Sequence, residues 1–139
     1  MVALDIWYDQ TPKDDDGSVV IRVNTVAELD ALIDRIIEET ADNVAPPMIQ
    51  VALSGVKRSP ALEVGLGKEK GFIGYTSRTE GGWTVGDGDA DTMVDYIYMG
   101  NHSEVSASVE VPISTVRRGL HEFLVAGARP SVVESDFAS

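Results

Sequence analysis

Residues 48–76, MIQVALSGVKRSPALEVGLGKEKGFIGYT, decide the fold class because apolar side chains recur in them at every second position. The alternating apolar residues are Ile49, Val51, Leu53, Leu62, Val64 and Leu66. This alternation is typical of β-strands that bury one face. Gly67 and Gly71 bracket a charged turn that leads into a third apolar run, residues 72–76, as in a β-hairpin. The stretch therefore predicts consecutive antiparallel strands.

Shorter apolar runs on both sides of this stretch predict the remaining strands. We expect them over residues 2–8, 18–23, 83–85, 93–99 and 104–111, with an edge strand over 131–135. Residues 93–99 are fairly apolar on both faces, which favours a central strand that a helix covers on one side. Residues 104–111 are amphipathic, with Val105, Ala107 and Val109 expected to face inward. Short turns between most of these runs make an antiparallel meander the simplest arrangement.

Two segments carry the three- and four-residue apolar spacing of amphipathic helices. The first begins with a capping box formed by Thr25 and Glu28 and is expected to end near Ala41. The second is expected to start at Pro112 or Ser114 and to end at a glycine cap. We therefore expect an α+β fold, an antiparallel β-sheet meander with two amphipathic helices packed on one face.

Length and composition limit the classes of function. The 139 residues suit a single domain, residues 1–139, and the hydrophobic share of 43% is ordinary for a globular protein. The net charge of −12 would repel nucleic acid and anionic lipid, so we expect neither as a partner and expect a basic protein instead. The chain has no cysteine, which excludes disulfides and thiol chemistry. No signal peptide or membrane-spanning run is recognisable, so we expect a cytoplasmic protein.

Residues 86–91, GDGDAD, invite comparison with a calcium-binding loop because carboxylates stand at alternate positions. The EF-hand pattern then fails, since Thr92 occupies the position that requires glycine and Tyr98 the position that requires glutamate. A solvated acidic turn is the better interpretation, and we expect no metal and no cofactor. The alternative function is a small acidic metal- or ligand-binding domain that uses the Asp87–Asp91 loop.

No catalytic motif accompanies the two histidines. His102 falls in an expected turn and His121 on the second helix, and neither stands in a pattern that supplies a nucleophile or a metal. The glycines at positions 65, 67, 71 and 74 lack the following helix and the lysine of a phosphate-binding loop. We therefore expect a binding protein and not an enzyme.

The order of charges singles out residues 79–116, which contain no lysine or arginine. The acidic residues of this segment are Glu80, Asp87, Asp89, Asp91, Asp95, Glu104 and Glu110. Aromatic residues lie among these acidic residues, and aromatic side chains pack either in the core of a protein or in an interface. Acidic and aromatic side chains together suit a basic partner, because the field speeds encounter and the aromatics provide tight contacts. We predict a partner-binding surface formed by Asp87, Asp89, Asp91, Asp95, Trp83 and Tyr96.

Several short motifs carry a resemblance to a known family. They are LEVGLG (62–67), GFIGY (71–75), GWTVGDGD (82–89), DYIY (95–98), EVPI (110–113) and LHEFL (120–124). Through these motifs, over half of the chain resembles the deaminase-associated immunity proteins of bacterial polymorphic toxin systems. The most distinctive segment is Trp83–Asp89, and Trp83, Glu110 and Pro112 correspond to recurrent family residues.

The resemblance implies a small α+β protein, encoded beside a toxin, that binds and neutralises the toxin in the producing cell. It points to a nucleic-acid deaminase as the toxin, with a nuclease as the alternative. A toxin that acts on nucleic acid needs basic side chains to hold phosphates, and an acidic inhibitor suits the same groove. We therefore predict an immunity protein that occludes the active site or the substrate groove of a cognate basic toxin domain.

Overall fold

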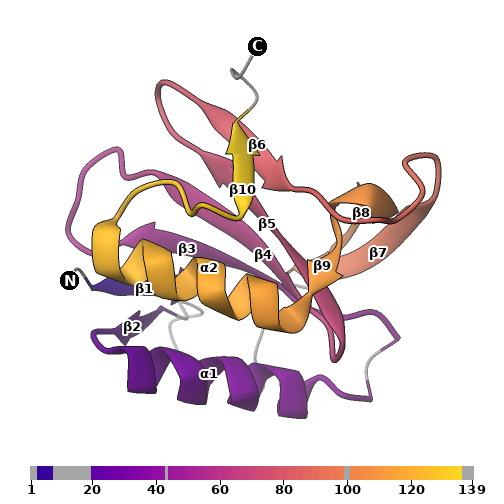
Figure 1. Ribbon diagram of the computed structural model, residues 1–139. Coiled ribbons are helices and arrows are strands. Elements are labelled where there is room, and N and C mark those ends of the chain that lie inside the picture. Colours follow the sequence, from indigo (N-terminus) through magenta and orange to yellow (C-terminus); the bar gives the residue numbers. More distant parts are fainter. Residues whose placement is uncertain (1–2, 8–19, 43, 99–100, 136–139) are drawn as a thin grey trace.

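The computed structural model describes residues 3–7, 20–42, 44–98 and 101–135 (Figure 1). In that part of the chain, the large sheet contains β1 (Leu4–Trp7), β2 (Ile21–Val23), β3 (Met48–Leu53), β4 (Ala61–Leu66), β5 (Lys70–Thr76), β6 (Gly81–Thr84), β9 (Val111–Pro112) and β10 (Val133–Ser135). Its strands follow the order β10-β6-β5-β4-β3-β1-β2, and β9 pairs with β5. The antiparallel succession from β3 to β6 confirms the expected meander. The ends of the expected strands at residues 2, 8, 18–19 and 99 lie outside the described residues.

Both helices cover the same face of the sheet, as Figure 1 shows for α1 (Val26–Glu39) and α2 (Ile113–Ala126). The predicted capping box is present: the Glu28 N–H donates to Thr25 Oγ1, and the Thr25 N–H donates to Glu28 Oε1, each at 3.1 Å. Helix α2 ends at Gly127, whose φ of 65° is left-handed and therefore suits glycine. The predicted α+β fold is confirmed.

The main core lies between the helices and the sheet. Its fully buried members include Leu29, Ile33, Ile36, Val51, Leu62, Val64, Ile73, Leu120 and Phe123. These residues come from the apolar stripes of both helices and from alternate positions of the central strands, as the two sequence periods predict. The opposite face of the large sheet, here called the outer face, is therefore left for other contacts.

The expectation of a central strand over residues 93–99 is wrong. Within the described residues, β7 (Met93–Tyr98) pairs with β8 (Asn101–Ser106) in a separate two-stranded sheet. This hairpin joins the large sheet through an isolated bridge between Pro47 and Ile97. The inner face of β7 is apolar because the hairpin packs on the outer face of the large sheet, opposite the face that α1 and α2 cover.

The strand expected over residues 104–111 also ends early. After Ser106 the chain forms a 3-10 turn, η1 (Ala107–Val109), and the Ser106 hydroxyl accepts a hydrogen bond from the Ser108 N–H at 3.2 Å. Ala107 and Val109 therefore lie in this turn and not on a strand. Serine side chains compete in this way with the backbone hydrogen bonds of a strand. The alternation of apolar residues does not register this competition, so the predicted strand is too long.

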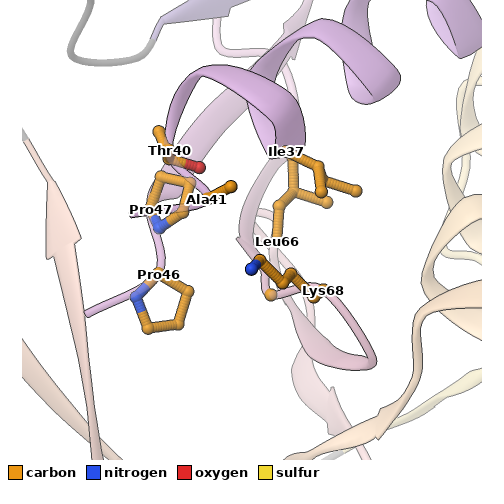
Figure 2. A pocket seen from close by; sticks show the side chains of 8 residues that line it. Ile37, Thr40, Ala41, Pro46, Pro47, Leu66 and Lys68 are labelled. Atoms are coloured by element: carbon orange, nitrogen blue, oxygen red, sulfur yellow. The ribbon is translucent and has the colours of Figure 1, made fainter. Parts of the chain in front are cut away.

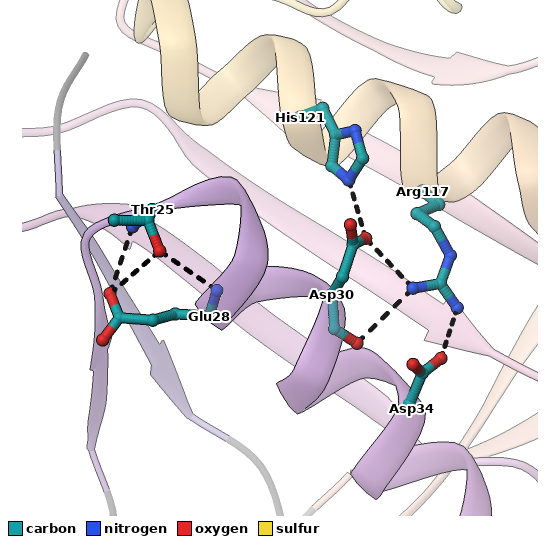
Figure 3. A network of polar contacts seen from close by, with 6 residues as sticks. All are labelled: Thr25, Glu28, Asp30, Asp34, Arg117 and His121. Carbon is teal, nitrogen blue, oxygen red and sulfur yellow. Dashed lines mark hydrogen bonds and ion pairs between the residues drawn. The ribbon is translucent and has the colours of Figure 1, made fainter.

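A polar network joins the two helices on their exposed side (Figure 3). Arg117 donates from Nη1 to Asp30 Oδ1 at 3.0 Å and from Nη2 to Asp34 Oδ1 at 2.8 Å. His121 Nε2 lies 2.7 Å from the same Asp30 oxygen. Burial works to raise the pKa of Asp30, but the hydrogen bonds from His121 and Arg117 outweigh it and hold that pKa below its ordinary value. Folding therefore favours the ionised form of Asp30.

We expect Asp30→Asn to lower the free energy of unfolding by about 1 kcal/mol at pH 7, because the network is only partly withdrawn from solvent. The folded-state pKa is lowered, so this stabilisation is present above the unfolded pKa of about 3.9 and is lost as the pH falls through the folded value. Urea unfolding at pH 7 and pH 3 measures the difference, with Asp42→Asn as an exposed control. An equal loss at both pH values would contradict the ionic origin.

Candidate functional site

The β7–β8 hairpin covers one part of the outer face. Phe72 and Met48 of the large sheet and Tyr96 of the hairpin are buried between the two, and the rings of Phe72 and Tyr96 meet edge to face with centroids 4.8 Å apart. Gly65 makes room for both rings, since a Cβ atom there would lie 2.5 Å from each of them. The close approach of the hairpin therefore depends on a position without a side chain.

A row of residues crosses the outer face at matching positions on neighbouring strands. From β10 to β1, these residues are Glu134, Trp83, Gly74, Glu63, Gln50 and Trp7. Directly paired residues of adjacent strands project on the same side of a sheet. We call these six residues the cross-sheet row. It contains two carboxylates and no lysine or arginine.

Trp83 is the exposed aromatic of this row, with 37% of its surface accessible. Its indole sits over Gly74, where a Cβ atom would lie 2.7 Å from Trp83 Cζ3, and it contacts the Phe72 ring with centroids 5.8 Å apart. Beside it lies a groove of about 410 Å³ whose lining includes Glu63 and Arg78. The indole is therefore held from below and from one side while it remains accessible to a partner.

The acidic loop, residues 86–91, is fixed against the η1 turn. The Gly86 N–H donates to Ser108 O at 2.7 Å, and the Ala107 N–H donates to Thr92 O at 2.8 Å. Within the loop, Asp89 Oδ1 accepts a hydrogen bond from the Asp91 N–H at 2.9 Å. The three predicted carboxylates of the loop, Asp87, Asp89 and Asp91, are all exposed.

Adjacent residues on β7 face opposite ways, which separates two of the predicted contacts. Asp95 is exposed and lies directly across from Glu104 of β8. Tyr96 is only 1% exposed, and its hydroxyl donates to Glu110 Oε2 at 2.6 Å. Burial, together with the hydrogen bond to Glu110, raises the pKa of Tyr96 far above its usual value. We therefore correct the role of Tyr96: it supports Phe72, and through it Trp83, from inside the protein.

Comparison with known families identifies the family of the chain. A family model described as Immunity protein Imm1 matches residues 17–136. The chain belongs to the Imm1 immunity protein family. No curated protein matches it. Family membership gives the protein an immunity function, which implies that it binds a cognate toxin protein.

Two acidic residues of this Imm1 chain escaped the sequence-based prediction. Glu63 and Glu134 flank Trp83 in the cross-sheet row, although they are distant from it in sequence. Their neighbourhood depends on strand order, and a single sequence carries no direct signal for it. The prediction was based on residues 79–116, which contain no lysine or arginine, and both glutamates lie outside that segment.

The described residues of the Imm1 chain contain no cluster of three or more histidine or acidic side chains that could hold a metal ion. His121 belongs to the interhelical network, and His102 lies on β8, where a turn was expected. Another pocket, of about 270 Å³, lies at the end of α1 (Figure 2). Its lining includes Ile37 and Leu66 and, as its titratable group, Lys68. Among the residues that the structure describes, the lining of this pocket therefore supplies no second titratable group beside Lys68.

One further finding concerns membranes. In the described segments, neither helix of this Imm1 chain is long and apolar enough to cross a bilayer.

Proposed function

We propose that this immunity protein neutralises a basic toxin domain that acts on nucleic acid, a deaminase or alternatively a nuclease, in the cytoplasm of the producing cell. It does so by occluding the active site or substrate groove of the toxin. The observation that carries the proposal is the continuity of the acidic surface. The loop, the η1 turn and the hairpin are joined by hydrogen bonds, including one from Ser106 Oγ to Ala90 O at 3.0 Å.

The charges of this surface support a basic partner. The segment 79–116 supplies it with carboxylates and with no lysine or arginine. Asp95 and Glu104 stand opposite each other on the hairpin, an arrangement that is unfavourable in the free protein. A cationic partner would relieve that repulsion. A nucleic-acid-binding groove offers such cations, and an acidic surface approaches it at an accelerated rate.

Two double variants test the surface while keeping side-chain size. Asp87→Asn/Asp91→Asn alters the loop, and Asp95→Asn/Glu104→Gln alters the hairpin. Each changes the net charge from −12 to −10, because two carboxylates become neutral amides. We expect each to slow association with the toxin domain encoded beside this gene by about 3–10-fold at low salt, with a weaker salt dependence. Stopped-flow association at several NaCl concentrations measures the effect.

The matched control is Glu38→Gln/Asp42→Asn, which makes the same change of charge at the end of α1. We expect it to retain most of the association rate. Equal slowing by all three double variants would mean that net charge alone matters. If the loop and hairpin variants associate as fast as the wild type at every salt concentration, the proposed surface is wrong.

A further inference from the structure

We propose that the cross-sheet row receives an arginine side chain of the toxin, whose guanidinium group stacks on Trp83 between the carboxylates of Glu63 and Glu134. The inference rests on the proposed function, because it assumes a basic toxin domain as the partner. It goes beyond that function by naming the chemistry of a second contact, separate from the acidic loop.

The indole is already placed to receive a flat cation. Three atoms of its six-membered ring lie within 2.7–3.1 Å of the point where a Gly74 Cβ would stand, so the ring rests above the β5 backbone. Phe72 contacts it from one side, and Phe72 is itself held by the buried Tyr96. A partner would therefore meet a supported ring and would not have to order a mobile one. Cations favour the face of such a ring, and tryptophan is the best of the aromatic residues for this contact.

Two carboxylates flank the indole in the row. Glu134 is paired directly with Trp83, and Glu63 follows on the other side, beyond Gly74, which has no side chain to intervene. With neighbouring strands about 4.8 Å apart, the α-carbons of the two glutamates stand about 5 and 10 Å from that of Trp83. Both glutamates are exposed, and within the described segments neither has a cation at ion-pair distance.

The other charges of the groove define the position of the cation. Glu80 lines the groove but is already paired with Arg129, whose Nε lies 2.9 Å from Glu80 Oε1. Arg78 also lines the groove, in the turn after β5, and its charge would repel the toxin arginine from that end of the groove. The free negative charge is therefore concentrated around Trp83, at Glu63 and Glu134.

Arginine fits this arrangement better than lysine. A guanidinium group is planar, so it stacks on an indole while its N–H groups point outward in the ring plane toward flanking carboxylates. An ammonium group binds as a point charge and cannot make both contacts in the same way. An anionic or purely apolar side chain would leave the two glutamates unpaired.

The experiment uses the full-length protein and the toxin domain encoded beside its gene. We expect Glu63→Gln/Glu134→Gln and, separately, Trp83→Leu to raise Kd by about tenfold or more in calorimetric titrations. The control Glu38→Gln/Asp42→Asn should change Kd by less than about threefold, since it lies on another surface. The glutamine variant keeps the sheet intact even where Trp83→Leu disturbs the packing on Phe72.

The toxin side identifies the arginine. Each toxin arginine is replaced by lysine, and one replacement should raise Kd about tenfold with the wild-type immunity protein but leave it unchanged with Trp83→Leu. If no toxin arginine shows this coupling, or if the row variants bind within twofold of the wild type, the inference is wrong. The proposed function would still stand if the loop and hairpin variants slow association. Failure of the wild-type protein to bind the toxin would overturn both.

Discussion

Phe72→Ala should lower the free energy of unfolding by about 3–5 kcal/mol, as expected for truncation of a fully buried phenylalanine. The Phe72 ring stands between Trp83 and Tyr96, with centroid distances of 5.8 and 4.8 Å. Its loss would leave a cavity beneath the hairpin and remove the side support of Trp83. The expected result is a less stable protein in which both parts of the candidate toxin-binding surface are displaced.

The matched variant is Phe123→Ala, which removes an equally buried ring from the core between the helices and the sheet. Urea unfolding should show a similar loss of stability for both variants. The fluorine resonance of 5-fluorotryptophan at Trp83, assigned against Trp83→Phe, should shift in Phe72→Ala and stay in place in Phe123→Ala. Equal shifts, or none, would show that Trp83 does not depend on Phe72.

The second large effect is expected at Gly86, where the acidic loop begins. A Cβ atom there would lie 1.7 Å from the Glu110 carbonyl oxygen, so Gly86→Ala forces two backbone segments apart. The hydrogen bond from the Gly86 N–H to Ser108 O, 2.7 Å long, would be lost with it. We expect a loss of about 2–4 kcal/mol in the free energy of unfolding.

Gly55→Ala is the control for this prediction. It adds the same methyl group where no heavy atom lies within 4 Å, and only its positive φ of 74° opposes the change. The expected loss is about 1 kcal/mol. Hydrogen exchange should show faster exchange of the amides of residues 86 and 107 in Gly86→Ala alone. A loop that keeps its protection in that variant would contradict the tight anchoring described above.

Local patterns in the sequence predict much of the fold. The alternation over residues 48–76 marks β3, β4 and β5, and Thr25 and Glu28 mark the start of α1. These features are readable because each depends on residues within one element and the turn that follows. Gly127 marks the end of α2 for the same reason.

The hairpin and the cross-sheet row were not predictable in this way. The apolar face of β7 indicates that this strand packs against another element. The alternation of apolar residues does not tell whether that element is a helix or the outer face of the large sheet. The acidic residues around Tyr96 in the sequence predict a partner contact there, but the side chain is buried. Glu134 reaches Trp83 only because the chain returns after α2 to the edge of the sheet, a long-range pairing.

The two hydrophobic clusters of the described chain share no residue, and the hairpin is attached largely through the second one. We therefore expect substitutions on the hairpin to disturb the packing of the helices little. Such separation suits an immunity protein whose cognate toxin changes during evolution. New binding specificities can then arise on the hairpin while the core between the helices and the large sheet keeps the protein folded.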